Sequence, residues 1–156
     1  MKNTTLCFLV KEDKVLLAMK KRGFGVGKWN GVGGKVEKEE SIKDAVVREA
    51  NEEISVSIHP DHLRHHGSIK FSFDGKPDWD QEVHIFITEK WEGEPAESEE
   101  MSPQWYAHGE LPFGDMWLDD PYWLPKVLAG KKIEGEFLFN NDGSEILKFE
   151  VREVEG

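Results

Sequence analysis

The sequence contains a single cysteine, Cys7, among its 156 residues. One thiol can form neither an internal disulfide nor a cysteine-rich metal site, so a reducing compartment suits the protein. Long hydrophobic runs are also missing. The apolar run from Leu6 to Val10 is too short for a signal-peptide core or a membrane span. We therefore expect a cytoplasmic protein without a membrane partner.

Positive charge is scarce as well. The chain has 20 Lys and Arg against 31 Asp and Glu, which gives a net charge of −11. Such a charge disfavours long DNA or RNA as a partner, because their phosphates would be repelled. A small anionic substrate is still compatible, since a metal ion and a local basic strip can outweigh the overall field. The strip would consist of Lys20, Lys21, Arg22, Lys28 and Lys35, which could equally be a solvated hairpin edge.

The length and the 38% hydrophobic content suit one domain over residues 1–156. We expect this domain to act as a monomer. Alternating patterns and turn signals predict strands at Thr4–Val10, Lys14–Met19, Gly67–Phe73, Glu82–Thr88, Gln104–Ala107, Ile133–Phe139 and Glu145–Val151. Helices are predicted over Ser41–Ile54 and Tyr122–Ala129. Strands interleaved with two helices predict a mixed sheet between helices, an α/β fold.

The segment from Gly34 to Val56 is the most informative part of the chain. Ser41 and Asp44 have the form of a capping box, and apolar residues then recur at helical spacing. The same spacing places Glu49, Glu52 and Glu53 in or beside the apolar stripe. Carboxylates at such positions repel one another and resist burial, so a cation should lie among them. Mg²⁺ fits because it takes oxygen ligands and bridges carboxylates to phosphates.

An ordinary charged helix, with Arg48 paired to Glu52 in water, is the competing interpretation. The loop before the helix favours the metal site instead. Gly31, Gly33 and Gly34 give this loop a backbone that can approach a phosphate or a metal closely.

The spacing of these glycines and acids resembles the signature box of the Nudix hydrolases. The resemblance implies an α/β/α sandwich and a divalent metal, Mg²⁺ with Mn²⁺ as a possible substitute. It also implies that Gly33, Glu49, Glu52 and Glu53 bind metal or activate water, that Arg48 orients a glutamate and that Glu40 supports the loop. The chain departs from the box at Ser55, where the family usually has glycine, and we expect this to alter stability more than chemistry.

The substrate is suggested by the aromatic residues, since six tryptophans are many for this length. The segment from Trp117 to Trp123 sets rings beside the adjacent acids Asp119 and Asp120. Rings stack on purines, and two neighbouring carboxylates tend to share a proton, so one can donate and the other accept. Alternatively, Asp120 followed by Pro121 caps a helix, and Trp117 or Trp123 belongs to the core.

Nearly the whole chain also resembles the MutT-homologue branch, the oxidised purine nucleoside triphosphatases that remove 8-oxo-dGTP. The similar segments are Met19–Gly25, Trp29–Gly31, Phe71–Phe73, Glu99–Met101, Phe113–Trp117 and Asp119–Asp120. The resemblance implies that Glu100 is associated with metal. It implies base contacts or pocket positions for Asn30, Asp119, Asp120, Trp117, Phe71, Phe73, Met101, Phe24, Lys20, Thr5 and Leu6. Departures at Pro121 and around Trp79 to Gln81 bear on the shape of this pocket and on its preferred purine.

We therefore expect Mg²⁺-assisted hydrolysis of a purine nucleoside triphosphate, such as 8-oxo-dGTP, 2-hydroxy-dATP or a methylated purine triphosphate, to the monophosphate and pyrophosphate. Glu49 and Glu53 would hold the metal, and Glu52 or Glu53 would take a proton from water. Two other interpretations compete. One is a Nudix hydrolase for ADP-ribose, a dinucleoside polyphosphate or a capped RNA end, and the other is a non-catalytic nucleotide sensor. The complete set of glutamates disfavours the sensor, and the acidic surface disfavours RNA.

Overall fold

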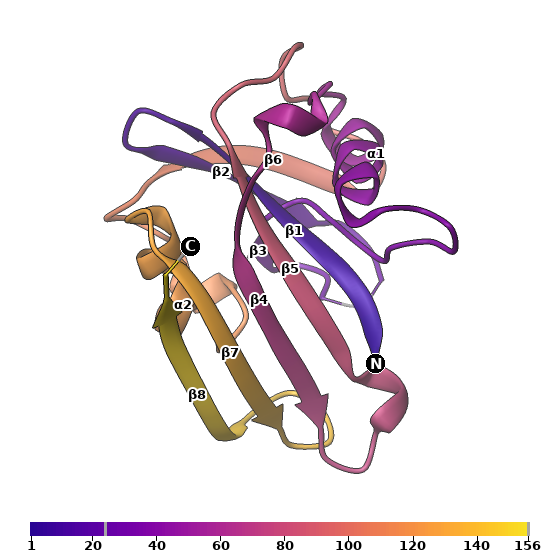
Figure 1. Ribbon diagram of the computed structural model, residues 1–156, viewed down its shortest axis with the longest axis vertical. Coiled ribbons are helices and arrows are strands. Elements are labelled where there is room, and N and C mark those ends of the chain that lie inside the picture. Colours follow the sequence, from indigo (N-terminus) through magenta and orange to yellow (C-terminus); the bar gives the residue numbers. More distant parts are fainter. Residues whose placement is uncertain (24, 156) are drawn as a thin grey trace.

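The computed structural model describes residues 1–23 and 25–155, so the expectation for Phe24 lies outside the described residues. The strands form one mixed sheet in the order β3-β2-β1-β5-β4-β7-β8, and β6 pairs with β2 (Figure 1). Their bounds are β1 (Lys2–Lys11), β2 (Lys14–Lys20), β3 (Trp29–Asn30), β4 (Arg64–Phe73), β5 (Gln81–Thr88), β6 (Met101–Ala107), β7 (Lys132–Phe139) and β8 (Ile146–Val154). The β1–β5 and β4–β7 pairs are parallel, and the other pairs are antiparallel.

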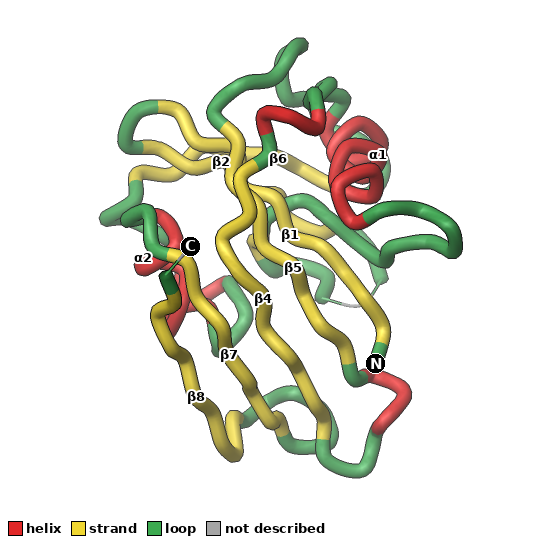
Figure 2. Tube along the Cα trace, viewed as in Figure 1, coloured by secondary structure: helices red, strands yellow, loops and turns green. Residues whose placement is uncertain are grey.

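Two helices pack on opposite faces of this sheet, as the mixed-sheet prediction required. Figure 2 shows α1 (Ile42–Ile54) at the upper right and α2 (Asp120–Leu128) on the left of the molecule. The core on the α1 side contains Cys7, Leu9 and Phe86, whereas the core on the α2 side contains Phe8, Ile85 and other residues of β4, β5 and β7. The parallel pair β1–β5 therefore contributes alternate side chains to both cores.

Helix α1 forms where the sequence predicts it. The Ser41 hydroxyl accepts a hydrogen bond of 3.1 Å from the backbone amide of Asp44, and Ala45, Val46, Ala50 and Ile54 are buried. The helix ends at Ser55, whose φ of 62° and ψ of 30° are left-handed. Glycine adopts this conformation without the steric penalty that a side chain incurs, which explains the usual glycine at this position of the box.

All seven predicted strands and both helices are present, with bounds that differ by a few residues. Strand β3 was not predicted, because two residues are too short for a periodic pattern. The 3₁₀ turns at Pro60–His62, Pro77–Trp79 and Phe113–Asp115 were not predicted either. Among the described residues, no helix is long and apolar enough to cross a membrane.

Candidate active site

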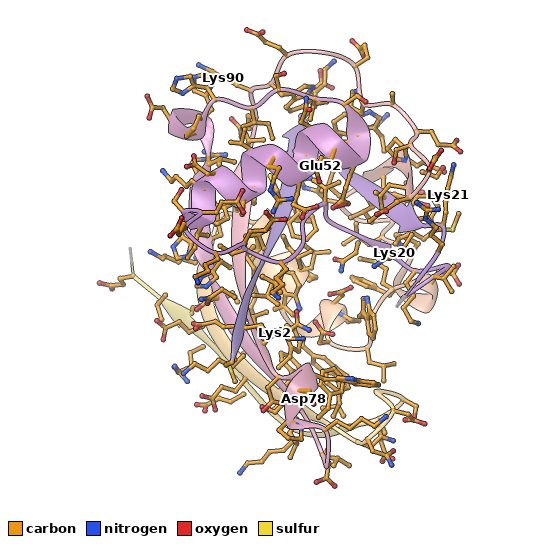
Figure 3. The ribbon with its side chains drawn as sticks, turned by 90° about the vertical axis from the view of Figure 1, so that its right-hand side faces the viewer. Lys2, Lys20, Lys21, Glu52, Asp78 and Lys90 are labelled. Carbon is orange, nitrogen blue, oxygen red and sulfur yellow. The ribbon has the colours of Figure 1, made fainter. Side chains whose placement is uncertain are left out.

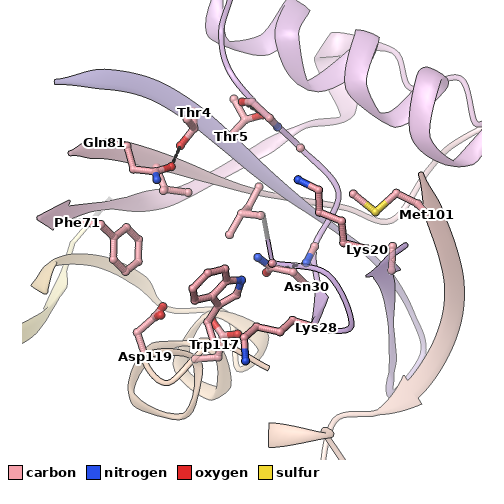
Figure 4. A pocket seen from close by; sticks show the side chains of 18 of the residues that line it. Thr4, Thr5, Lys20, Lys28, Asn30, Phe71, Gln81, Met101, Trp117 and Asp119 are labelled. Carbon is pink, nitrogen blue, oxygen red and sulfur yellow. Dashed lines mark hydrogen bonds between the residues drawn. The ribbon is translucent and has the colours of Figure 1, made fainter. Parts of the chain in front are cut away.

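A cavity of about 230 Å³ opens between the sheet and the segment that leads into α2 (Figure 4). Its walls come from β1, β2, β3, β4, β5, β6 and β7 and from the loops after β2 and β3. The lining residues are Thr4, Thr5, Leu6, Ala18, Lys20, Gly25, Lys28, Asn30, Gly31, Gly33, Gly34, Phe71, Phe73, Gln81, Val83, Met101, Trp117, Asp119, Asp120 and Phe139. Every described residue that the sequence assigns to the base pocket lies in this wall.

The glycine loop connects this cavity to helix α1. Gly33 and Gly34 line the cavity, and the backbone amide of Gly33 donates a 3.2 Å hydrogen bond to Oε1 of Glu53. A Cβ atom on Gly33 would lie 1.9 Å from the Thr5 carbonyl oxygen, and one on Gly34 would lie 2.7 Å from Oε1 of Glu49. Only glycine at position 33 allows the loop to pass this close to the backbone of β1, whereas a side chain at position 34 would displace the Glu49 carboxylate.

Glu49 and Glu53 form a pair of carboxyl groups beside this loop. Glu53 is buried, and its Oε2 atom has no hydrogen-bond partner among the described residues. Burial, together with the neighbouring carboxyl group of Glu49, raises the pKa of Glu53 to about 9. Glu53 therefore holds a proton at neutral pH in the absence of a cation.

Arg48 donates hydrogen bonds to three glutamates of this region. Its Nε and Nη2 atoms donate to the two carboxylate oxygens of Glu40 at 2.8 and 3.0 Å, and its Nη1 donates to Glu49 at 3.0 Å and to Glu52 at 3.3 Å. Its Nη2 also donates to the Lys35 carbonyl at 3.2 Å. These bonds raise the pKa of Arg48 and lower the pKa of Glu40. Arg48 thus holds the Glu49 side chain and the loop before α1 in one arrangement.

The structure does not bring all the predicted glutamates together. The prediction that Glu52 lies in or beside the buried stripe is wrong, because its side chain is 59% exposed and it pairs with Arg48 one helical turn away. Figure 3 shows Glu52 on α1 and Lys20 on β2 on one side of the molecule. Val47, which precedes Arg48 on the same helix, packs partly against the core. One residue along a helix is a rotation of about 100°, which separates the buried Glu53 from the exposed Glu52.

Glu100 also lies apart from the carboxyl pair. Its carboxylate accepts a 3.4 Å hydrogen bond from Arg22, and its side chain is 58% exposed. Across residues 1–23 and 25–155, no three acidic, histidine or cysteine side chains converge into a group that could hold a metal ion.

The pair of Glu49 and Glu53 nevertheless fits a hard divalent cation. The buried Oε2 atom of Glu53 has no hydrogen-bond partner among the described residues, and the carboxyl group of Glu49 lies beside Glu53 and contributes to its raised pKa. A divalent cation would displace the proton of Glu53 and favour its ionised form. The site therefore offers two carboxylates as first ligands, whereas Glu52 and Glu100 are exposed and pair with Arg48 and Arg22.

Asp119 and Asp120 form a second acidic pair, at the opposite end of the cavity. Both are buried, and Oδ2 of Asp119 accepts a 2.8 Å hydrogen bond from Nε1 of Trp123. Burial raises the pKa of Asp119 to about 6, while burial and the charge of Asp119 raise the pKa of Asp120 well above its usual range. At pH 7 the geometry therefore favours an ionised Asp119, which accepts, and a neutral Asp120, which can donate.

The alternative in which Asp120 caps the second helix is wrong in the cap residue, although Pro121 lies in the first turn as that alternative proposed. Asp120 is the first residue of α2, and the residue at the cap position, Asp119, makes no capping hydrogen bond with its side chain. Trp123 is a core residue with 1% exposure, as that alternative proposed. Trp117 is only half-buried and lines the cavity beside Asp119.

The predicted basic strip is divided between two roles. Lys20 and Lys28 line the cavity, and Nζ of Lys28 lies 5.6 Å from the ring centroid of Trp117. Lys21 instead pairs with Glu97, and Arg22 pairs with Glu99 and Glu100. The strip is therefore partly a cavity wall and partly a contact between two surface loops.

Sequence reasoning did not assign Thr4, Lys28, Gln81, Val83 or Phe139 to the site, although all five line the cavity. The alternation of side chains along a strand shows which residues share a face, but it does not show which face holds the cavity. That depends on how strands distant in the sequence pair. Two of the five could have been found from the sequence. Lys28 belongs to the predicted basic strip, and Gln81 belongs to the segment from Trp79 to Gln81, where the chain departs from the MutT-homologue branch.

The sequence matches known proteins along most of its length. The model of the NUDIX domain family matches residues 2–127. The chain is 47% identical over 151 residues to the oxidized purine nucleoside triphosphate hydrolase of Mus musculus, covering 97% of this chain and 94% of that protein. It is 46% identical to the protein of the same name from Danio rerio, with the same coverage.

The fold matches solved structures as well. The crystal structure of the MutT protein from Bacillus halodurans superposes with a TM-score of 0.83 at 28% sequence identity, and the match covers 97% of each chain. The MutT Nudix hydrolase of Burkholderia pseudomallei superposes with a TM-score of 0.65 at 23% identity, covering 71% of this chain and 86% of that one.

Proposed function

The chain belongs to the Nudix hydrolase family, and we propose that it hydrolyses oxidised purine nucleoside triphosphates to the monophosphate and pyrophosphate, which removes them from the nucleotide pool. One observation carries this proposal: the glycine loop at Gly33 and Gly34 joins an aromatic cavity with a buried acidic pair to the carboxyl pair on α1. Relatives that share nearly half of the sequence bear the name of this activity.

Base recognition rests on the cavity end of this arrangement. An ionised Asp119 and a neutral Asp120 offer an acceptor and a donor side by side, and Trp117, Phe71 and Phe73 supply apolar surface. Asn30 lies in the same wall, with its Oδ1 accepting from the amide of Gly31 at 2.8 Å. Because a buried polar group without a partner carries a penalty of about 1–3 kcal/mol, these residues select bases by hydrogen-bond pattern.

Phosphate hydrolysis rests on the carboxyl pair. We assign Glu49 and Glu53 as first ligands of a divalent cation, Mg²⁺ with Mn²⁺ as a substitute, and the backbone of Gly33 lies beside them. Glu52 and Glu100 would become further ligands of the cation only if their ion pairs with Arg48 and Arg22 broke. The bound cation would polarise the phosphate and lower the pKa of a bound water.

The remaining steps belong to the side chains of the chain itself. Glu52 or Glu53 takes the proton of the attacking water, the water oxygen bonds to phosphorus, and the P–O bond of the α–β bridge breaks to give the monophosphate and pyrophosphate. Arg48 keeps Glu49 in position through its bonds to Glu40 and Glu49. Lys20, on the cavity wall near the glycine loop, supplies positive charge for the phosphates. Because all these residues come from one chain, we propose that a monomer is active.

The experiment is product analysis of 8-oxo-dGTP incubated with the protein and Mg²⁺. We expect the nucleoside monophosphate and pyrophosphate as the products, and no reaction when the metal is chelated. Asp119→Ala should retain hydrolysis but reduce the preference for the oxidised base over dGTP. Release of inorganic phosphate, or an unchanged preference in Asp119→Ala, would contradict the proposal.

A further inference from the structure

Two polar side chains interrupt the apolar wall of the cavity that β1, β4, β5 and β7 provide. The β1–β5 register pairs Thr4 with Val83, and the β4–β5 register pairs Phe71 with Gln81. Directly paired residues point to the same face of a sheet, so Thr4 and Gln81 stand among apolar neighbours that also line the cavity. These neighbours are Leu6, Phe71, Phe73, Val83 and Phe139.

The hydrogen bond between these two residues orients the Gln81 side chain. The Thr4 hydroxyl donates to Oε1 of Gln81 at 3.0 Å. This engages the amide oxygen and leaves the amide nitrogen, with two N–H donors, for another partner. Figure 4 shows Thr4 and Gln81 on the wall of the cavity away from Asp119 and Trp117. A base bound between the two walls would therefore meet Asp119 and Asp120 on one side and an amide donor on the other.

We propose that Gln81, oriented by Thr4, determines specificity by donating a hydrogen bond to an exocyclic carbonyl oxygen of the purine. This inference rests on the proposed function and adds a second point of base recognition to it. Oxidation of a purine introduces such an oxygen: the keto form of 2-hydroxyadenine carries one, whereas adenine carries none. A bound adenine would leave the amide donor dehydrated and without an acceptor, which disfavours binding.

The test is the ratio of kcat/KM for 2-hydroxy-dATP to kcat/KM for dATP in the wild type and in Gln81→Met. Methionine keeps the length of the side chain and removes both N–H donors. We expect the ratio to fall about tenfold, equal to about 1.4 kcal/mol, mainly through a higher KM for 2-hydroxy-dATP. Gln81→Glu keeps the shape and replaces the donors by an acceptor, so its ratio should fall further.

The matched control is Gln104→Met, because Gln104 is exposed on β6 and does not line the cavity. Its ratio should equal that of the wild type. An unchanged or higher ratio in Gln81→Met or Gln81→Glu, with an active wild type, would overturn this inference and leave the proposed function intact. A wild type that hydrolyses neither 8-oxo-dGTP nor 2-hydroxy-dATP would overturn both.

Thr4→Val isolates the orienting role of the hydroxyl group. Valine keeps the shape of threonine but cannot donate to Oε1 of Gln81, so the amide can rotate and the ratio should fall by a smaller factor than in Gln81→Met. In the double variant the two effects should not add, because both act through the same hydrogen bond. Fully additive effects would mean that Thr4 does not orient Gln81.

Discussion

The indole Nε1 of Trp123 donates a 2.8 Å hydrogen bond to Oδ2 of Asp119 inside the core. This bond distinguishes the two adjacent acids, since Asp119 has a donor and Oδ2 of Asp120 has no hydrogen-bond partner among the described residues. A donor favours the ionised form of a carboxyl group. Trp123 therefore keeps the negative charge of the pair on Asp119 and the proton on Asp120.

Trp123→Phe should remove this bond and retain most of the packing against Phe8. The pKa of Asp119 should then rise above its value of about 6, because the ionised form loses its donor. We expect kcat/KM for 8-oxo-dGTP at pH 7 to fall about tenfold and the pH profile to move to higher pH. Trp91→Phe, which alters a ring pair on the other side of the molecule, is the control. A lower activity with an unmoved pH profile would point to packing alone.

The acidic pair should also lower the stability of the free protein at neutral pH. The pKa of Asp119 is raised from 3.8 to about 6, so between these values the folded state binds more protons than the unfolded state, and stability falls as pH rises. Asp120→Asn replaces a carboxyl group that the folded state keeps protonated at pH 7, and that the unfolded state ionises, by an amide that is neutral in both states. It should increase the free energy of unfolding at pH 7 by about 2 kcal/mol, with the gain vanishing near pH 4. Denaturant unfolding at both pH values measures this, and an equal gain at both would contradict it.

Glu53→Gln should abolish turnover, with a loss of at least about a thousandfold, while leaving the fold unchanged. The pKa of Glu53 is raised to about 9, so its carboxyl group is already neutral at pH 7 without metal, and glutamine replaces it closely. Mg²⁺ should raise the melting temperature of the wild type but not that of the variant. Glu94→Gln, in the exposed loop before β6, is the control. Normal activity in Glu53→Gln would show that the metal assignment is wrong.

Ser55→Gly should stabilise the protein without changing its activity. Ser55 ends α1 with a φ of 62°, a conformation that costs an L-residue about 1 kcal/mol relative to glycine. Part of this gain is lost because glycine is more flexible in the unfolded chain. We expect an increase of about 0.5–1 kcal/mol in the free energy of unfolding, equal to a rise of about 1–4 °C in melting temperature for a chain of this size. A lower melting temperature would show that the serine side chain contributes a compensating contact.

Local signals in the sequence were sufficient for the regular elements. The cap at Ser41 and the apolar spacing that follows it depend only on neighbours within a few residues, and α1 begins and ends where they indicate. The acids of the box were also found from spacing. Their individual exposure was not, because the difference between Glu52 and Glu53 depends on which part of α1 packs against β1 and the glycine loop.

Contacts between segments that are distant in the sequence could not be predicted from the sequence pattern. Thr4 and Gln81 are separated by 77 positions and meet only because β1 pairs in parallel with β5. The spacing of four residues between Asp119 and Trp123 can bring their side chains together on a helix, but it does not show that the indole donates to this carboxylate. The sequence therefore located the cavity and its acids but not the hydrogen bonds that orient them.

The most direct test of the account is Mg²⁺-dependent pyrophosphate release from 8-oxo-dGTP, 2-hydroxy-dATP, O6-methyl-dGTP, dGTP and ADP-ribose, compared by kcat/KM. The account predicts that an oxidised or methylated purine triphosphate leads dGTP and ADP-ribose by tenfold or more, a transition-state preference of about 1.4 kcal/mol. Preferred cleavage of ADP-ribose, or no cleavage of any of the five, would contradict the role assigned to the cavity and its acidic pair.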